Sequence, residues 1–445
     1  MITSIFRVVL LTLSAFACLA LLLAKAHTQE LPKAAAVATQ IGQTAEFQDD
    51  VKAVSYSRST EGYYLSFGAP YPKQILSVWI EGKMYERLPL HKSMVGRTVR
   101  ISGQIEKSPT GPLIKLESKD HFQVLETDEA ILSKPTLDGK QDRSQFESAV
   151  WQTFKREDFN TLEVLSQELQ QSRERLNDGG WLSESFFNAF RLGDKTSDER
   201  YAEVEQILAR WEQARPASPV LSLIKANYHV DLAWKWRGVD YTVTPQGRAG
   251  FKKELAVARQ LLDAHPSAKV YPEYFACMQK VALGQFWSKT DYERLFAEAT
   301  SIEPDYYSFY YNKAVYLLPR WHGRKGEWDA FAEQVRQQRG AGGAGDAFYA
   351  RIAWALRDYY GCNTLFTDSD ISWEKVASGY EYLIRQYPDS RYLKSLYANL
   401  AWKADDRVRL RQALPAIKSD PDMTIWVNLE NVAMAEKFAA SEPAR

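Results

Sequence analysis

Residues 303–310 read Glu303-Pro304-Asp305-Tyr306-Tyr307-Ser308-Phe309-Tyr310, a proline turn that leads into an aromatic-rich segment. Similar turns stand at Ser218-Pro219, His265-Pro266 and Tyr387-Pro388, and the four prolines are separated by 47, 38 and 84 residues. The last gap is twice 42, with Gly345-Asp346 midway. Proline is favoured in the first turn of a helix, where its missing N–H costs nothing. A proline-opened helix pair about every 40 residues is typical of a helical solenoid of the tetratricopeptide type.

Upstream of this array, the region from residue 42 to residue 126 shows the two-residue alternation of β-strands. The alternating or apolar runs cover residues 62–68, 75–80, 96–105, 113–116 and 122–125. Glycine and proline turns separate them, which favours short antiparallel strands. This pattern predicts a small barrel or sandwich. Residues 127–144 are polar and are interpreted as a linker, and residues 145–440 are predicted to form the helical domain.

The N-terminal residues 1–26 have the features of a secretion signal. Arg7 precedes an apolar run, and Ala24-Lys25-Ala26 fits the small-x-small pattern of a signal-peptidase site. The alternative is an uncleaved anchor, because residues 5–24 are close to the length that crosses a bilayer. The sequence thus predicts a periplasmic or secreted protein, with membrane attachment only through this segment. Cleavage would leave Cys277 and Cys362, either as one disulfide or as two buried thiols.

Length and composition limit the classes of protein to consider. A chain of 445 residues with 45% hydrophobic and 25% charged residues is expected to fold into two or three globular domains. The 56 basic and 56 acidic residues balance, so no global charge attracts nucleic acid or an anionic membrane.

The β-rich region also carries a recognisable order of residues. The positions concerned are Gly62, Leu65, Phe67, Gly68, Tyr71, Pro72, Val78, Ile80, Gly96, Val99, Ile101, Gly103, Pro112, Ile114 and Leu116. This order resembles the OB-fold modules of exported bacterial proteins. The resemblance implies a small OB-like β-barrel. Together with the repeat array it predicts a multidomain α+β protein, in which this barrel is followed by an all-α, tetratricopeptide-like solenoid.

OB-folds can bind single-stranded nucleic acid through aromatic rings in a basic groove. Tyr63 and Tyr71 are therefore candidate binding residues. The acids and bases of residues 42–126 are about equal in number, however, whereas a nucleic-acid domain should be basic. We expect a module that faces protein or glycan, or one with a structural role, ahead of a nucleic-acid binder.

Part of the helical region resembles a family of uncharacterised, tetratricopeptide-like bacterial domains. The residues that carry this likeness include Trp234-Lys235-Trp236-Arg237-Gly238, Glu303-Pro304-Asp305-Tyr306 and Pro319-Arg320-Trp321-His322-Gly323, within residues 200–360. The likeness implies a fold and brings no known activity with it.

Two Trp/Arg clusters are the strongest candidates for binding: Trp236 with Arg237, and Arg320 with Trp321. Arginine beside tryptophan can stack on the ring and hold a carboxylate with two hydrogen bonds. Under the alternative interpretation these arginines stabilise helix C-termini, since Gly238 follows one of them as a C-cap glycine would.

The sequence has no set of residues that requires a particular reaction. The glycines of residues 340–345 spell a dinucleotide fingerprint, but a helical pattern precedes them where a strand is needed. We predict no catalytic residue, metal site or cofactor, and expect a non-catalytic envelope scaffold that holds a protein or peptide partner. The alternatives are an enzyme acting on cell wall or glycan in an aromatic cleft, and single-stranded nucleic-acid binding by the OB-like module.

Overall fold

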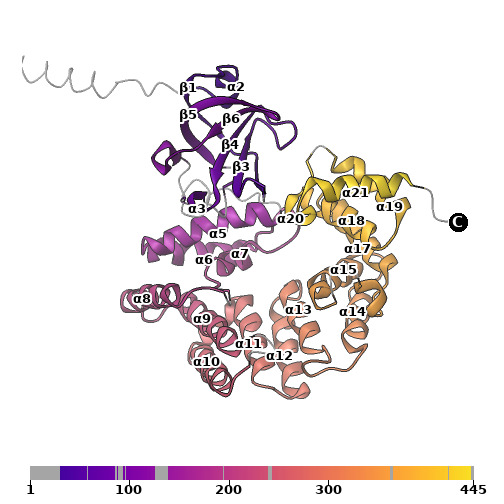
Figure 1. The fold of residues 1–445 in the computed structure, drawn as a ribbon. Helices are drawn as coiled ribbons and strands as arrows, with labels where there is room; N and C mark the ends of the chain where they lie inside the picture. The colour runs from indigo at the N-terminus through magenta and orange to yellow at the C-terminus, as the bar shows by residue number, and fades with distance from the viewer. Residues whose placement is uncertain are drawn as a thin grey trace, which may run out of the picture. The chain divides into compact units, whose positions relative to one another are not determined.

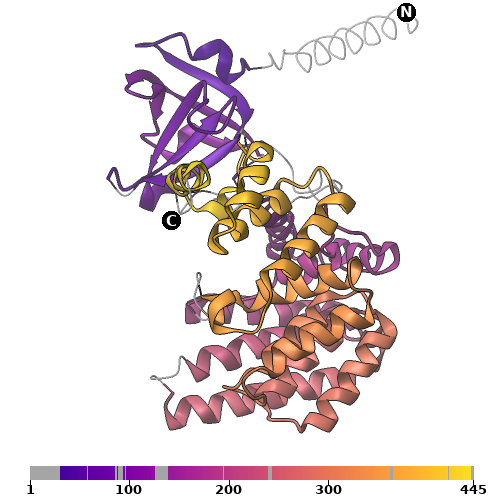
Figure 2. The same cartoon turned by 90° about the vertical axis from the view of Figure 1, so that its right-hand side faces the viewer.

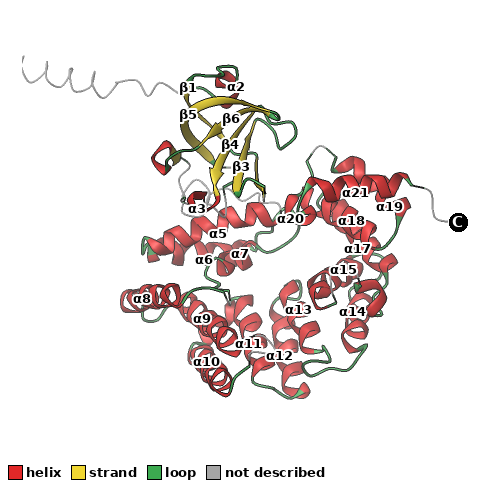
Figure 3. Ribbon diagram, viewed as in Figure 1, coloured by secondary structure: helices red, strands yellow, loops and turns green. Residues whose placement is uncertain are grey.

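The computed structural model describes residues 31–57, 59–85, 88, 94–95, 97–125, 139–193, 195–238, 243–360, 364–418 and 420–441. The chain divides into two compact units at Leu125 and Glu126. Strands are confined to the first unit and the second is helical (Figure 3). The protein is therefore of mixed α+β class. The predicted secretion signal lies outside the described residues, as does Cys362.

The first unit, called the sheet unit here, is built on seven strands. They are β1 (Thr44–Asp50), β2 (Ala53–Ser57), β3 (Gly62–Phe67), β4 (Leu76–Glu81), β5 (Thr98–Ser108), β6 (Gly111–Lys115) and β7 (Phe122–Val124), with short helices α2 (Ala34–Val37) and α3 (Gly82–Tyr85). The strand order is β1-β5-β6-β4-β3-β2, and β7 pairs with β5. All pairs are antiparallel except β4 with β6.

The core of the sheet unit follows the alternation seen in the sequence. Val99, Ile101 and Ile105 of β5 are fully buried, and Arg100 between them is exposed. Phe47 and Phe67 meet edge to face at 5.0 Å between ring centroids. The five strands expected from the alternation are present within one to three residues of their predicted ends. Strands β1 and β2 lie in a stretch for which no strand was predicted.

The second unit, called the helical unit here, consists of helices packed in sequence order (Figures 1 and 2). They are α5 (Gly139–Lys155), α6 (Phe159–Ser172), α7 (Leu182–Asn188), α8 (Asp198–Ala214), α9 (Pro219–Arg237), α10 (Pro245–Ala264), α11 (Pro272–Gly284), α12 (Lys289–Ile302), α13 (Tyr307–Tyr316), α14 (Glu327–Gln338), α15 (Ala344–Leu356), α16 (Leu365–Asp368), α17 (Trp373–Gln386), α18 (Arg391–Lys403), α19 (Arg407–Ala413), α20 (Met423–Trp426) and α21 (Leu429–Ala440). Helix α5 begins at Gly139, six residues before the predicted start.

Each proline turn precedes a helix, but Pro304 and Pro388 lie ahead of the N-cap residues Tyr306 and Ser390 and not in the first turn. Pro219 occupies the first turn of α9, and the Ser218 hydroxyl accepts the N–H of Leu221 at 2.9 Å, which caps the helix. The Pro266 turn forms a short 3-10 helix (Pro266–Val270) ahead of α11. The glycine-rich segment at 340–345 follows α14 and runs into the first turn of α15, so a helix and not a strand precedes it. The dinucleotide-type fingerprint is thus a connection between two helices.

Among the described residues, no helix combines the length and the apolar character needed to cross a bilayer.

Candidate functional site

In the structure, the arginines of the two predicted Trp/Arg clusters do not lie over the tryptophans next to them in the sequence. The Arg237 guanidinium lies over the rings of Trp234 and Trp321, at 5.5 and 5.2 Å from their centroids. Trp234 and Trp321 meet edge to face at 5.5 Å. Arg320 lies instead over Tyr359, at 4.5 Å. The structure thus brings Arg237 and Trp321 together and leaves Arg320 beside another ring.

Trp236 is 51% exposed. Its ring lies against Gly250 of α10, so closely that a Cβ atom added to this glycine would lie 2.7 Å from the ring. In the sheet unit, Tyr63 is stacked on Tyr85 with 4.1 Å between centroids. Tyr71 is 48% exposed. Tyr63 therefore packs on its own unit, and Tyr71 and Trp236 offer accessible rings.

A different site emerges where the connection between α6 and α7 lies against later helices. Trp181 Nε1 donates to the carbonyl of Asp305 at 3.1 Å, and the Ser308 hydroxyl donates to Glu184. The Trp181 ring contacts that of Tyr306, with centroids 5.7 Å apart. These contacts join residues more than a hundred positions apart in the sequence.

The middle of the same connection is held through Asp178, which is fully buried. Its carboxylate pairs with Arg143 of α5, and its carbonyl accepts a hydrogen bond from Arg351 of α15. Gly179 fits closely here, since a Cβ atom would lie 2.6 Å from the Tyr387 ring, and its φ of +80° suits glycine. The connection turns back on itself, because the N–H of Leu176 donates to the carbonyl of Gly180 at 2.8 Å. This turn is bound by three separate helical regions.

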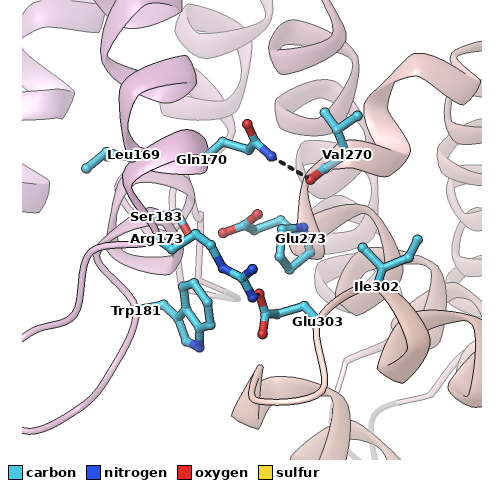
Figure 4. A pocket seen from close by; sticks show the side chains of 10 residues that line it. Leu169, Gln170, Arg173, Trp181, Ser183, Val270, Glu273, Ile302 and Glu303 are labelled. Atoms are coloured by element: carbon cyan, nitrogen blue, oxygen red, sulfur yellow. Dashed lines mark hydrogen bonds and ion pairs between the residues drawn. The ribbon is translucent and has the colours of Figure 1, made fainter.

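Beside this segment is a cavity of about 90 Å³ that Figure 4 shows from close by. Its lining residues come from α6, the α6–α7 connection, the start of α11 and the end of α12. They are Leu169, Gln170, Arg173, Trp181, Ser183, Val270, Pro272, Glu273, Ile302 and Glu303.

Glu273 is the unusual group in this cavity. Its side chain is buried, its Oε1 accepts the Tyr306 hydroxyl at 3.1 Å, and its Oε2 has no hydrogen-bond partner in the described part of the chain. Burial raises the pKa of Glu273 to about 7, against the opposing effect of hydrogen bonds, among them one from Ser183. The neighbouring Glu303 differs, because Arg173 pairs with it. Glu273 therefore changes charge near neutral pH.

A second group of polar residues continues from α7 across α11, α13 and α15. We call it the polar face, and it consists of Glu184, Arg191, Lys280, Tyr307, Tyr311 and Arg351, all half-buried. Arg351 lies over the Tyr307 ring at 4.4 Å. Arg191 is held by Asp231 of α9, with Nε 2.9 and 2.8 Å from the two carboxylate oxygens.

Lys280 is the least satisfied member of the polar face. No hydrogen bond or ion pair of its ammonium group is found within the described ranges. Burial, with a smaller contribution from the nearby Arg191, lowers the pKa of Lys280 to about 8. One turn earlier in α11, burial raises the pKa of the free thiol of Cys277 to about 11. The thiol is thus inert, whereas the lysine can take an anionic partner.

Sequence reasoning did not find Glu273 or Lys280. Both lie in α11, whose sequence is apolar around most of its circumference and which is buried nearly throughout. A charged residue in a helix of this kind is an exception to the usual burial pattern. That exception is the signal in the sequence that could have identified them.

The chain matches no protein-family model, no curated protein and no solved structure. The two family resemblances noted in the sequence therefore stay predictions, and the functional argument rests on the geometry above.

Proposed function

We propose that this protein is a non-catalytic binding or scaffold protein of the cell envelope, and that the polar face of its helical unit holds an extended segment of a protein partner. The observation that carries the proposal is the α6–α7 connection. Arg143 of α5 binds this stretch at the Asp178 carboxylate, and Arg351 of α15 binds it at the Asp178 carbonyl. Its Trp181 donates to the backbone carbonyl of Asp305, ahead of α13. The adjoining polar face also carries arginine side chains, and its Lys280 ammonium group has no partner in the described residues.

The charges of the polar face indicate the chemistry of the partner segment. Arg191 is compensated by Asp231, and Glu184 accepts from Ser308. Lys280 is left without a partner in the described residues. An acidic side chain or a C-terminal carboxylate would complete it, and the rings of Tyr307 and Tyr311 would pack on the neighbouring residues. We thus propose an acidic peptide segment as the ligand.

The proposal includes a tetratricopeptide-type solenoid for the helical unit. Its support is the succession of packed neighbours: α9 with α10, α11 with α12 and α13 with α14, and then α9 with α11, α11 with α13, and α13 with α15. Repeat proteins of this kind bind extended ligands along the helices that line one side.

The proposal also includes an OB-like barrel for the sheet unit. Strands β1 and β2 stand at opposite ends of the pairing path, yet only Val51 and Lys52 separate them in the chain. The N–H of Val51 donates to Arg97 O at 3.0 Å, and the N–H of Lys52 donates to Ser66 O at 2.8 Å. Because the chain passes directly from the strand at one end of this order to the strand at the other end, it supports closure of the sheet into a barrel.

Site-specific photo-crosslinking tests the binding proposal. A photoreactive phenylalanine analogue replaces Tyr311 on the polar face or, as a matched control, Val408, which is 64% exposed on α19. In intact producing cells we expect one discrete, saturable adduct from position 311 and none from position 408. The adduct should weaken when Lys280→Ala is added. Equal adducts from both positions, or none from 311, would overturn the proposal.

A further inference from the structure

The cavity beside Glu273 has an imbalance of charge. Two carboxylates, Glu273 and Glu303, line it with a single cation, Arg173. Arg173 pairs with Glu303, so the lining supplies no countercharge to Glu273. An ionised carboxylate that is buried without a cation is strongly disfavoured, and a buried polar atom without a hydrogen bond costs free energy as well.

We propose that this cavity is a binding site for a primary ammonium group on a short methylene chain. The ammonium would donate to Glu273 Oε2, the buried oxygen that has no partner among the described residues. It would bring the charge of the lining to zero. Figure 4 shows the Glu273 carboxylate directed into the space between α6 and the start of α11.

The walls fit the rest of such a ligand. Leu169, Val270 and Ile302 provide apolar surface for methylene groups, as the stem of a lysine side chain requires. The volume of about 90 Å³ exceeds the roughly 10–15 Å³ that one water molecule needs by this measure. A group of several non-hydrogen atoms can therefore enter.

The ionisation of Glu273 sets the pH dependence of this site. The charged or titratable groups around its carboxyl come from every neighbouring element: Tyr271 before α11, Tyr306 at the start of α13, Glu184 on α7, Arg173 after α6 and Glu303 after α12. Burial raises the pKa of Glu273 to about 7. Ammonium binding requires the ionised form, so affinity should rise about tenfold from pH 6 to pH 8, as the ionised fraction does.

The inference goes beyond the proposed function, because an ammonium pocket could serve a free amine as well as a lysine of a partner. Methyl NMR of the full chain can test it directly. The probes are n-butylammonium, the neutral n-butanol, and a lysine residue blocked at both ends. We expect n-butylammonium to shift the methyl signals of Leu169, Val270 and Ile302, and to leave that of the distant, exposed Val408 unchanged. The blocked lysine binds too if the source is a side chain, and fails to bind if only free amines fit.

Glu273→Gln is the decisive variant, because it keeps the oxygen that accepts from Tyr306 and removes the charge. We expect at least a tenfold loss of n-butylammonium affinity at pH 8, with a nearly unchanged thermal unfolding midpoint at about pH 4, where the Glu273 carboxyl is largely protonated in both the folded and the unfolded chain. The matched control is Glu298→Gln on α12, whose carboxylate pairs with Lys269 outside the cavity. Equal shifts with n-butanol, or equal affinity in Glu273→Gln, would show that the Glu273 charge does not select an ammonium group. No methyl shifts at all would show that the cavity holds only water. Each of these results would overturn the inference. None of these results would affect crosslinking at Tyr311.

Discussion

The two units place their charged side chains differently. In the sheet unit, Arg100 and Glu46 pair across β5 and β1 at 2.8 Å, with 45% and 39% of their side chains exposed. In the helical unit, the carboxylates of Asp178 and Asp231 are 0% and 5% exposed in their ion pairs. The sheet unit thus keeps this ion pair in water, although its Arg97 is fully buried, whereas the helical unit brings several ion-paired carboxylates inside.

This difference shows where function should be sought. Exposed ion pairs contribute little to the free energy of unfolding, whereas each buried charge needs a partner. Where the partner is missing, as at Glu273 and Lys280, the pKa moves toward neutrality and the group is ready for a ligand. Both of these groups lie in α11 of the helical unit.

The largest effect is expected for Asp231→Ala. The substitution leaves Arg191 without its carboxylate and the N–H of Leu192, which donates to Asp231 at 2.8 Å, without an acceptor. Removing one partner of a buried pair should cost about 4 kcal/mol of unfolding free energy. Urea unfolding followed by circular dichroism measures it.

The control for that experiment is Glu212→Ala in the same unit. Glu212 is 52% exposed in its pair with Lys225. A loss there of about 0.5 kcal/mol or less is expected. Similar losses at positions 231 and 212 would show that burial does not distinguish the two pairs.

Glu273→Gln should change the pH dependence of stability. The folded-state pKa of about 7 lies above the ordinary 4.5, so between these values the folded protein binds more protons than the unfolded chain. Stability should therefore fall as the pH rises from about 4.5 to 7, by up to about 3 kcal/mol from this group. The variant should lose that slope and be the more stable protein at pH 8. Parallel stability curves for the two proteins from pH 5 to pH 8 would contradict this expectation.

Gly323→Ala should destabilise the helical unit by about 2 kcal/mol through a steric clash. A Cβ atom at Gly323 would lie 1.7 Å from the carbonyl oxygen of Leu317, a backbone atom that cannot rotate away. At Gly193 a Cβ atom would meet nothing within 4 Å, so Gly193→Ala is the matched control and should be near neutral. Thermal unfolding of both variants checks the difference, and an equally mild effect at the two positions would sink it.

The smallest effect is expected in the sheet unit. Glu46→Ala removes an exposed cross-strand pair with Arg100 and should cost less than about 1 kcal/mol. Added salt should reduce this cost further, because exposed pairs are screened. A loss as large as that of Asp231→Ala would remove the distinction between the two units.

The fold could be predicted from the sequence where each element carries its own signal. Strand β3 is bounded by glycines, and α9 begins with a capped proline turn. Strands β1 and β2 could not be predicted, because Phe47 is the only fully buried residue of β1 and the remaining residues are mostly polar. Their strand form depends on pairing with β5 and β3, which are distant in sequence.

The candidate site was harder to predict for the same reason. Glu273 follows Pro272 in the first turn of α11, where an acidic residue is ordinary because it favours the helix dipole. Its burial results from Tyr306 and Ser183, both distant in the sequence. The Trp/Arg clusters were visible because their members are adjacent in the chain, but the structure divides their contacts between different rings.

The central claim is that the helical unit carries the partner surface. It is tested most directly by comparing photo-adduct yields from Tyr311 on the polar face and Tyr71 in the sheet unit, which is 48% exposed. Tyr311 is half-buried and Tyr71 is exposed, and the same photoreactive residue replaces each in turn. We expect a saturable adduct from position 311 that disappears in the Lys280→Glu background, and none from position 71. An adduct from position 71 alone would place the partner surface on the sheet unit and contradict the claim.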